Sequence, residues 1–379
     1  MHRVEYLLWL KHMGISSNAK FLDAIEYFSS PEELYKADKE AYEECGMFND
    51  KEMEYLINKD ISFVSAEVER CNRARVYLVD YFSKAYPESL RSIPEPPLIL
   101  YVAGDRRVLN TPSVTMVGSR KADSYGMNIS RDLSSAFAQA GYTIVSGMAQ
   151  GIDQSSMLGA IATGGKAIGV LCCGMDVDYP SGSADFRSKI IENGGAVISE
   201  FEFGTPALSG YFPVRNRIMA GLSDLTVMVQ AGEKSGALIT AHLAMEYGKC
   251  VAAVPGRIDI EESKGCFALI NEGATMITDA EGFVSEYIAS VPKKEEIKEE
   301  KGSEIKPEKK TSGKTAVRQG ENESDNMLAL LELLKKEPLT SQELSERSGR
   351  PFKWVASTLI ILEVSGKVKM MPDGKYSVN

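Results

Sequence analysis

Six short apolar runs follow one another through the middle of the chain, and stretches with helical periodicity lie between them. Two of these stretches, Ile129–Ala140 and Leu238–Tyr247, carry apolar residues at every third or fourth position. Continuous apolar strands separated by helices are typical of a parallel sheet that is buried on both faces. The pattern from about residue 112 to residue 289 therefore predicts a doubly wound α/β core with a mainly parallel sheet. The apolar runs are Val114–Val117, Thr143–Val145, Ala167–Leu171, Ala196–Ile198, Leu225–Val229 and Cys250–Val254.

The first 75 residues lack such runs. Their apolar residues have helical spacing instead, at Leu7–Leu10, Phe21–Ile25 and Met53–Ile57. This pattern predicts a small helical domain over residues 1–75. A further strand is expected at Leu98–Val102, before the six apolar runs. Together with this strand, we expect the α/β domain to extend over residues 76–290.

The C-terminal part of the chain divides into a linker and a small domain. Residues 291–325 contain many charges of both signs, no aromatic residue and few branched aliphatic residues. Such a segment cannot bury enough apolar surface to offset its ordering entropy, so we expect a disordered linker. Residues 326–379 show three helical stretches followed by two strand-like segments around Pro372-Asp373-Gly374, a hairpin turn signal. This order predicts a winged helix.

Composition narrows the class of protein. The net charge is −10, and no apolar stretch approaches the roughly 18 residues that a membrane span requires. The six cysteines show no zinc-ligand spacing, so we expect reduced, mostly buried thiols in a cytoplasmic protein without a metal site. The acidic balance disfavours general binding of polyanions, and any nucleic-acid site must therefore be a local basic groove.

Four turns with anion-binding character follow the predicted strands. The first is Gly118-Ser119-Arg120, the second begins at Ser146-Gly147, the third carries Arg215 and Arg217, and the fourth contains Ser235, Gly236 and Thr240. Glycines let a ligand approach the backbone, helix N-termini present free N–H groups, and arginine adds a bidentate donor. The carboxyl ends of parallel strands meet at one sheet edge, so we expect these turns to form one anion site.

Each turn also has a purely structural interpretation. Gly118 could merely turn the chain, and Asp153 fits a helix N-terminus without any catalytic role. Arg215 or Arg217 could pair with Glu200 or Glu202. Neither a dinucleotide-binding glycine pattern nor a Walker loop occurs in this region. The signal is therefore the set of turns and not any one of them.

These motifs, in this order, resemble one family, DprA/Smf. The resemblance covers about residues 80 to 285. It rests on the four turns together with the following segments: Gly151-Ile152-Asp153, Gly165-Lys166 before a strand, Asp176 with Tyr179-Pro180, Ile198-Ser199-Glu200, Phe212-Pro213 with Arg215-Asn216-Arg217, Leu238-Ile239-Thr240, Val254-Pro255-Gly256 and Gly273-Ala274.

The resemblance implies a Rossmann-like domain that binds single-stranded DNA without sequence preference and forms a homodimer. It further implies delivery of the strand to the RecA recombinase during natural transformation, with no catalytic activity and no cofactor. Arg215 and Lys166 are weaker candidates for DNA contacts than the other positions. The residues that the resemblance assigns to the DNA site are Gly118, Ser119, Arg120, Gly147, Lys166, Arg215, Arg217, Ser235, Gly236 and Thr240.

Several positions depart from the family's pattern. Gln150 and Ser181 stand where basic residues are common, so the affinity for DNA could be weaker or more dependent on dimerisation. Ser156-Met157 replaces Ala-His, Gln230 replaces a frequent glutamate, and Phe267 replaces a frequent asparagine. Phe267 could stack on a base, although a core position is the commoner role for such a residue.

Two other functions compete with this interpretation. Related Rossmann-like enzymes cleave nucleotides at the N-glycosidic bond, but their Pro-Gly-Gly-x-Gly-Thr loop is absent and no nucleophile–base pair is evident. The second competing function is that of a transcription regulator that reads duplex DNA with its winged helix. Its recognition helix would be Phe352–Glu363, where Lys353 is the single basic residue, too few donors for major-groove readout.

Overall fold

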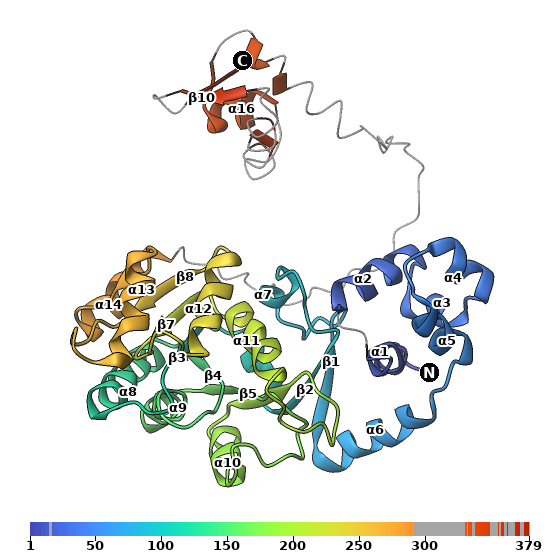
Figure 1. Cartoon of the computed structure of the whole chain (residues 1–379), viewed down its shortest axis with the longest axis horizontal. Coiled ribbons are helices and arrows are strands. Elements are labelled where there is room, and N and C mark those ends of the chain that lie inside the picture. Colours follow the sequence, from blue (N-terminus) through green and yellow to red (C-terminus); the bar gives the residue numbers. More distant parts are fainter. Residues whose placement is uncertain are drawn as a thin grey trace, which may run out of the picture. The chain divides into compact units, whose positions relative to one another are not determined.

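A computed structural model describes residues 1–14, 17–291 and part of the segment between 330 and 378. The chain forms two compact units, Met1–Glu295 and Glu296–Asn379. The predicted linker lies almost entirely outside the described residues. Figure 1 shows the first unit as a sheet with helices on both faces and a group of helices beside its first strands. None of the described helices combines the length and the apolar character needed to cross a membrane.

One sheet of nine strands organises the first unit, in the order β1-β2-β6-β5-β4-β3-β7-β8-β9. The pairs from β6 to β9 are parallel, whereas β1 with β2 and β2 with β6 are antiparallel. The predicted Rossmann-like architecture with a mainly parallel sheet is therefore confirmed. The strands are β1 (Val76–Asp80), β2 (Ile99–Gly104), β3 (Ser113–Val117), β4 (Thr143–Ser146), β5 (Ala167–Val170), β6 (Ala196–Ser199), β7 (Leu225–Met228), β8 (Cys250–Ala253) and β9 (Thr275–Met276).

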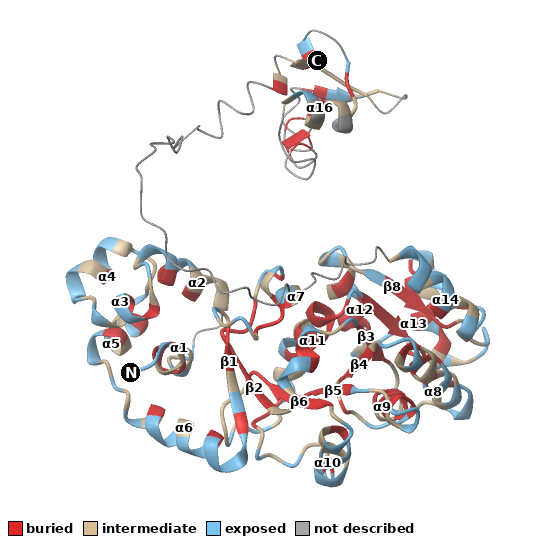
Figure 2. Cartoon of the chain, turned by 180° about the vertical axis from the view of Figure 1, so that it is seen from behind, coloured by how far each residue is buried: buried red, intermediate tan, exposed pale blue. Residues whose placement is uncertain are grey.

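Apolar side chains project from both faces of this sheet and pack against helices. Val114 and Met116 pack with α8, α9 and α14, whereas Val117 and Val145 pack with α11, α12 and α13 on the opposite face. Figure 2 shows the central strands buried between these layers. Burial on both faces explains why the strands read as continuous apolar runs. The helices of this region are α7 (Glu88–Arg91), α8 (Ser124–Gln139), α9 (Ile152–Ala162), α10 (Ala184–Glu192), α11 (Tyr211–Leu222), α12 (Ala237–Glu246), α13 (Lys264–Asn271) and α14 (Ala280–Ser290), with 3-10 turns at Arg106–Asn110 and Glu261–Ser263.

The described part of residues 1–75 contains six helices, which confirms the predicted helical character of this region. They share one apolar cluster with the first two strands, in which Trp9 and Phe21 pack together with Leu98 and Tyr101. Because the helices and the sheet edge bury the same cluster, this contact fixes the helices against β1 and β2. The helices are α1 (Arg3–His12), α2 (Asn18–Tyr27), α3 (Pro31–Lys36), α4 (Lys39–Cys45), α5 (Asp50–Asn58) and α6 (Ser62–Ala74).

The second unit contains α16 (Ser341–Ser348) and a pair of antiparallel strands, β10 (Val368–Met370) and β11 (Tyr376–Val378). Thr340 caps α16: its hydroxyl accepts from Glu343 N at 3.2 Å, and Glu343 Oε2 accepts from Thr340 N at 2.8 Å. Leu344, Leu359 and Val368 belong to its core. The predicted hairpin turn and most of the predicted recognition helix lie outside the described residues.

Candidate nucleic-acid interface

A cavity of about 1050 Å³ opens at the carboxyl ends of β3 and β7. The turn after β3 forms one wall, the loop between β7 and α12 forms the opposite wall, and the first turns of α11 close the end between them. In the sheet, β4, β5 and β6 follow one another on one side of β3, whereas β7 and β8 follow on its other side, so the direction in which strands are added reverses at β3. A reversal of this kind is the usual ligand site of an open α/β sheet.

The turn after β3 is built from close backbone contacts. A Cβ on Gly118 would lie 2.7 Å from Ile152 Cγ1 and 2.8 Å from Gln230 O, so a side chain at this position does not fit. Ser119 N donates to Gln230 O at 2.6 Å, and Ser119 Oγ accepts from Lys121 N at 3.0 Å. These contacts hold Ser119 at the cavity wall and show that packing requires a glycine at position 118.

Arg120 is exposed at the cavity. Its Cζ lies 5.2 Å from the centre of the Phe212 ring, and that ring packs edge-on against Tyr179 with 5.6 Å between centres. A guanidinium over an aromatic face gains roughly 0.5–1 kcal/mol at an exposed site and keeps its in-plane N–H donors available. The contact with Phe212 thus holds Arg120 at the cavity.

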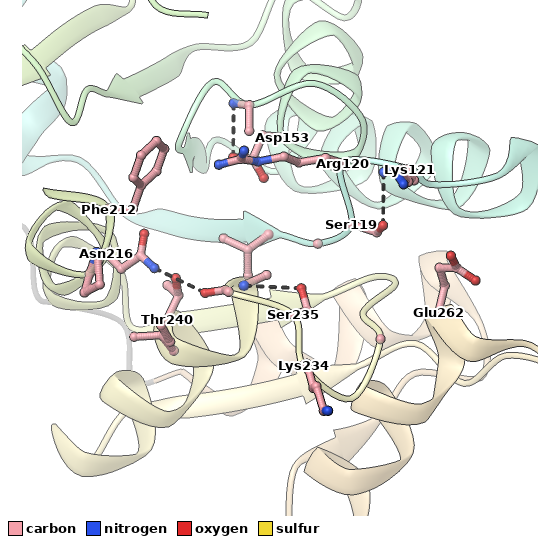
Figure 3. A pocket seen from close by; sticks show the side chains of 18 of the residues that line it. Ser119, Arg120, Lys121, Asp153, Phe212, Asn216, Lys234, Ser235, Thr240 and Glu262 are labelled. Atoms are coloured by element: carbon pink, nitrogen blue, oxygen red, sulfur yellow. Dashed lines mark hydrogen bonds between the residues drawn. The ribbon is translucent and has the colours of Figure 1, made fainter. Parts of the chain in front are cut away.

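The opposite wall carries hydroxyl groups at the start of α12. Ser235 Oγ accepts from Ala237 N at 3.3 Å, and open space surrounds the Cβ position of Gly236. Thr240 is fully buried, and its hydroxyl has no hydrogen-bond partner among the described residues. Figure 3 shows Ser235 and Thr240 across the cavity from Ser119 and Arg120.

Arg215 lies beneath the cavity and is almost fully buried. Its Nη1 donates to Val170 O at 2.9 Å, and its Nε donates to Asn216 Oδ1 at 3.1 Å. Burial lowers the pKa of Arg215 and raises the pKa of Asp153, and each group opposes the shift of the other. Asp153 also accepts from Ala149 N at 3.3 Å. Both charged groups are therefore buried beneath the cavity, and Asp153 is not placed as an exposed catalytic acid.

Arg217 makes a buried ion pair instead of lining the cavity. Its Nη2 contacts both carboxylate oxygens of Glu200 at 2.7 Å, with side-chain exposures of 11% and 7%. Glu200 Oε1 also accepts from Asn18 Nδ2 of α2 at 2.7 Å. Glu200 is one of the two carboxylates proposed from the sequence as a partner, and this pairing is the arrangement present. Arg217, which was expected at the groove, does not line the cavity.

Two other expected positions lie elsewhere. Lys166 directly precedes β5 and so lies at the amino edge of the sheet, opposite the cavity. Gly147 contacts the Arg215 guanidinium, which occupies the space that a Cβ would need. The cavity brings together seven of the ten expected residues, and these are Gly118, Ser119, Arg120, Arg215, Ser235, Gly236 and Thr240.

Several lining residues were not singled out from the sequence. Lys121 and Lys234 add positive charge next to Arg120 and Ser235, and their adjacency to the predicted motifs was the available signal. Glu233, Glu261 and Glu262 add negative charge at the rim, and no motif indicated them. Glu261 pairs with Lys264 at 2.6 Å. The rim is therefore mixed in charge, although the expected groove was basic.

The departures from the family pattern have structural explanations in two places. Gln230 is buried, donates to Asp123 Oδ1 at 2.9 Å and accepts from Asp123 N at 3.2 Å, so it ties β7 to the start of α8. Phe267 lies in α13, partly buried and outside the cavity. In the described part of the chain, no group of three or more His, Cys, Asp or Glu residues could hold a metal ion.

Comparison with known proteins identifies relatives over most of this unit. Protein Smf of Synechocystis sp. is 39% identical over 196 residues, which are 51% of this chain and 49% of that protein, so the chain spans about half the length of this relative. DNA processing protein A of Streptococcus pneumoniae has a similar structure, with a TM-score of 0.66 and 31% identity over 76% of this chain and 99% of that chain.

A second solved structure, of DNA processing protein A from Helicobacter pylori, has a TM-score of 0.52 and 29% identity over 57% of this chain and 96% of that chain. The DprA winged helix domain matches residues 314–374, which confirms the predicted C-terminal module. The model of DNA recombination-mediator protein A matches residues 77–288, more than half of the chain. The chain therefore belongs to the DNA recombination-mediator protein A family, also called DprA/Smf.

Proposed function

We propose that this protein binds single-stranded DNA without sequence preference through the cavity, and that it passes the strand to the RecA recombinase in the cytoplasm. Natural transformation is the setting in which a recombination mediator of this family would act. The proposal includes no catalytic activity and no cofactor.

One observation carries the proposal. Ser119 and Arg120 face Ser235, Gly236 and Thr240 across the cavity at a topological switch point. Hydroxyls, a guanidinium and helix N-terminal N–H groups recognise phosphate oxygens and not base edges, so the contacts carry no sequence information. The solved structure of the Helicobacter pylori relative concerns the way in which that protein binds single-stranded DNA, which is the class of ligand that we propose here.

The net charge of −10 limits what one site can contribute. The protein as a whole repels a polyanion, and Glu233, Glu261 and Glu262 lie at the rim of the cavity. We propose that two protomers pair through their Rossmann-like domains and hold one strand in two cavities. Linking two weak sites makes the second contact intramolecular and so raises the overall affinity. Light scattering should then give twice the 41.5 kDa mass of the chain.

The test is a fluorescence titration of labelled oligothymidylate with Arg120→Ala and Arg106→Ala. Arg120 lies at the cavity, whereas Arg106 lies over the Tyr77 ring of the edge strand β1. We expect Arg120→Ala to weaken binding roughly tenfold or more, because charge-assisted hydrogen bonds contribute about 1.5–3 kcal/mol. Arg106→Ala should leave binding unchanged. Equal affinities of the two variants would place the DNA site elsewhere.

The N-glycosidase-type alternative receives no comparable support. The described lining of the cavity contains no histidine or cysteine, and Asp153 is buried. The protein should therefore release no free base from nucleoside monophosphates. Steady release of base in such an incubation would instead favour the enzyme.

A further inference from the structure

A second cavity, of about 950 Å³, lies between the helices α4 and α5. Figure 1 shows these helices on the side of the N-terminal helical group that faces away from the sheet. The lining positions in α5 recur three or four residues apart, so one face of this helix forms the wall. These residues are Asp50, Met53, Glu54 and Ile57, and α4 contributes Tyr42 and Glu43. We call this cavity the α4–α5 groove.

The floor of the α4–α5 groove is apolar. The Tyr42 hydroxyl donates to Leu34 O at 2.6 Å, which fixes the buried ring, and Phe48 packs edge-on against that ring with 6.0 Å between centres. Phe48 and Met53 are partly exposed, and Ile57 is 44% exposed. Covering apolar surface of this kind stabilises a complex, and methionine adapts its shape to an apolar partner. The folded chain thus leaves this apolar floor partly open to solvent.

The rim of the α4–α5 groove is acidic. Residues 31–58 carry nine acidic and three basic side chains, and Glu43, Asp50 and Glu54 line the groove. Lys39 pairs with Glu43 at 3.3 Å, whereas Asp50 and Glu54 have no ion pair among the described residues. Asp50 also suits the positive end of the dipole of α5, but Glu54 lies beyond the first turn and has no such role. The rim therefore repels polyanions and complements a basic partner.

The carboxylates of the rim are spread along the groove and do not converge on one point. Among the described His, Cys, Asp and Glu residues, no group of three or more could hold a metal ion. Several separate positive charges match this arrangement better than one small cation does. The ligand class is therefore a molecule that carries basic groups along its length beside an apolar surface.

The walls of the α4–α5 groove also indicate the conformation of such a partner. They are two helical faces and the loop between them, and no strand edge lies among the described lining residues. An extended peptide finds no row of backbone partners there, whereas a helix pairs its own N–H and C=O groups. A groove between helices reads a helical partner through apolar side chains three or four residues apart.

We propose that the α4–α5 groove binds a basic amphipathic helix of another protein. The apolar face of that helix lies against Phe48, Met53 and Ile57, and its lysine or arginine side chains lie beside Asp50 and Glu54. This interaction surface goes beyond the proposed DNA binding and does not depend on it, because the two cavities share no lining residue.

The test is a fluorescence anisotropy titration of the full chain with a labelled helical peptide of about five turns, which carries leucines along one face and lysines elsewhere. Two control peptides accompany it. One has the same composition with the leucines spread around the helix, and the other has glutamates in place of the lysines. We expect the amphipathic basic peptide to bind roughly tenfold or more tightly than the first control, because only its leucines can reach the groove together. The acidic peptide should not bind.

The apolar contribution is measured with Ile57→Gln. We expect this variant to bind the amphipathic peptide roughly fivefold or more weakly, because the exposed part of Ile57 is no longer available to be covered. Ile288→Gln is the matched control, since Ile288 of α14 is 36% exposed and does not line the groove. It should bind the peptide as the unaltered chain does. Both side chains are partly solvent-exposed, so both variants should fold.

The charge contribution is measured with Glu54→Gln. We expect a loss of roughly two- to fivefold, the effect of one exposed charge pair. Glu26→Gln removes the same charge from the exposed face of α2, outside the groove, and should leave the affinity unchanged. The inference fails if the control peptide with spread leucines binds as tightly as the amphipathic one, since net charge alone would then explain binding. It also fails if either groove variant binds as tightly as its control. These titrations contain no DNA, so their outcome is separate from that of the DNA proposal.

Discussion

Gly147 is a position where one methyl group should disturb the cavity floor. A Cβ at this residue would overlap the guanidinium of Arg215, which is itself fixed by Val170 O and Asn216. We expect Gly147→Ala to reduce the free energy of unfolding by about 1–3 kcal/mol, the usual cost of overpacking, and to lower Tm. Gly210→Ala is the control, since open space surrounds the Cβ position of Gly210 and its φ is −67°. Similar melting temperatures for the two variants would contradict the packing assignment.

The pair formed by Arg217 and Glu200 should be structural. Removing the carboxylate with Glu200→Ala leaves a buried guanidinium without its counter-charge, and we expect a loss of about 3–5 kcal/mol in denaturant unfolding. Asp259→Ala breaks the exposed pair with Arg257 and should change the free energy of unfolding far less, because solvent screens this pair. If Glu200→Ala is no more destabilising than Asp259→Ala, then Arg217 does not depend on this partner, and a role at the DNA site becomes tenable again.

At the scale of single elements, α2 depends on a carboxylate from outside the helix. Glu95 accepts from Ser17 Oγ at 2.8 Å, from Asn18 N at 2.7 Å and from Ala19 N at 3.1 Å. These bonds satisfy helix N-terminal donors and place a negative charge at the positive end of the helix dipole. The loop that precedes β2 is thereby joined to the N-terminal helices.

We therefore expect Glu95→Ala to destabilise α2 locally by about 1–3 kcal/mol. Amide hydrogen exchange over residues 18–27 should become faster, while exchange in the central strands stays slow. Glu88→Ala removes an exposed carboxylate that pairs with Arg91, and it should not change exchange in α2. Unchanged exchange in the Glu95 variant would show that Ser17 alone caps the helix.

The elements of the sheet differed in how well the sequence predicted them. Strands β3 to β8 appear within about one residue of their apolar runs, because burial on both faces leaves a strong local pattern. Strand β1 and the two-residue β9 were not expected. They lie at the two edges of the sheet. There, neither the pattern of apolar residues nor the length of the segment distinguishes a strand from a loop. The antiparallel pairing of β2 with β6 also depends on contacts between distant segments.

At the scale of the whole molecule, DNA binding should respond strongly to salt. Each phosphate neutralised on a single strand contributes a slope of roughly −0.7 to the plot of log affinity against log salt concentration. A strand long enough for both protomers of the proposed dimer should give a steeper slope than a strand that fills one cavity. Titrations of short and long oligothymidylates over several salt concentrations would measure both slopes. Identical slopes would argue against two cavities acting on one strand.

The sequence by itself determined the order of strands and helices and the residue types at the strand ends. These properties are local: an apolar run, a helix cap or a glycine turn acts over a few neighbouring residues. The amino-edge position of Lys166 also follows from its place before a strand. Only the tertiary structure decided which arginine is available to a ligand, because Arg217 meets Glu200 through folding, whereas Arg120 meets the Phe212 ring at the cavity. Partners of a charge are set by contacts between distant segments, and no local pattern encodes them.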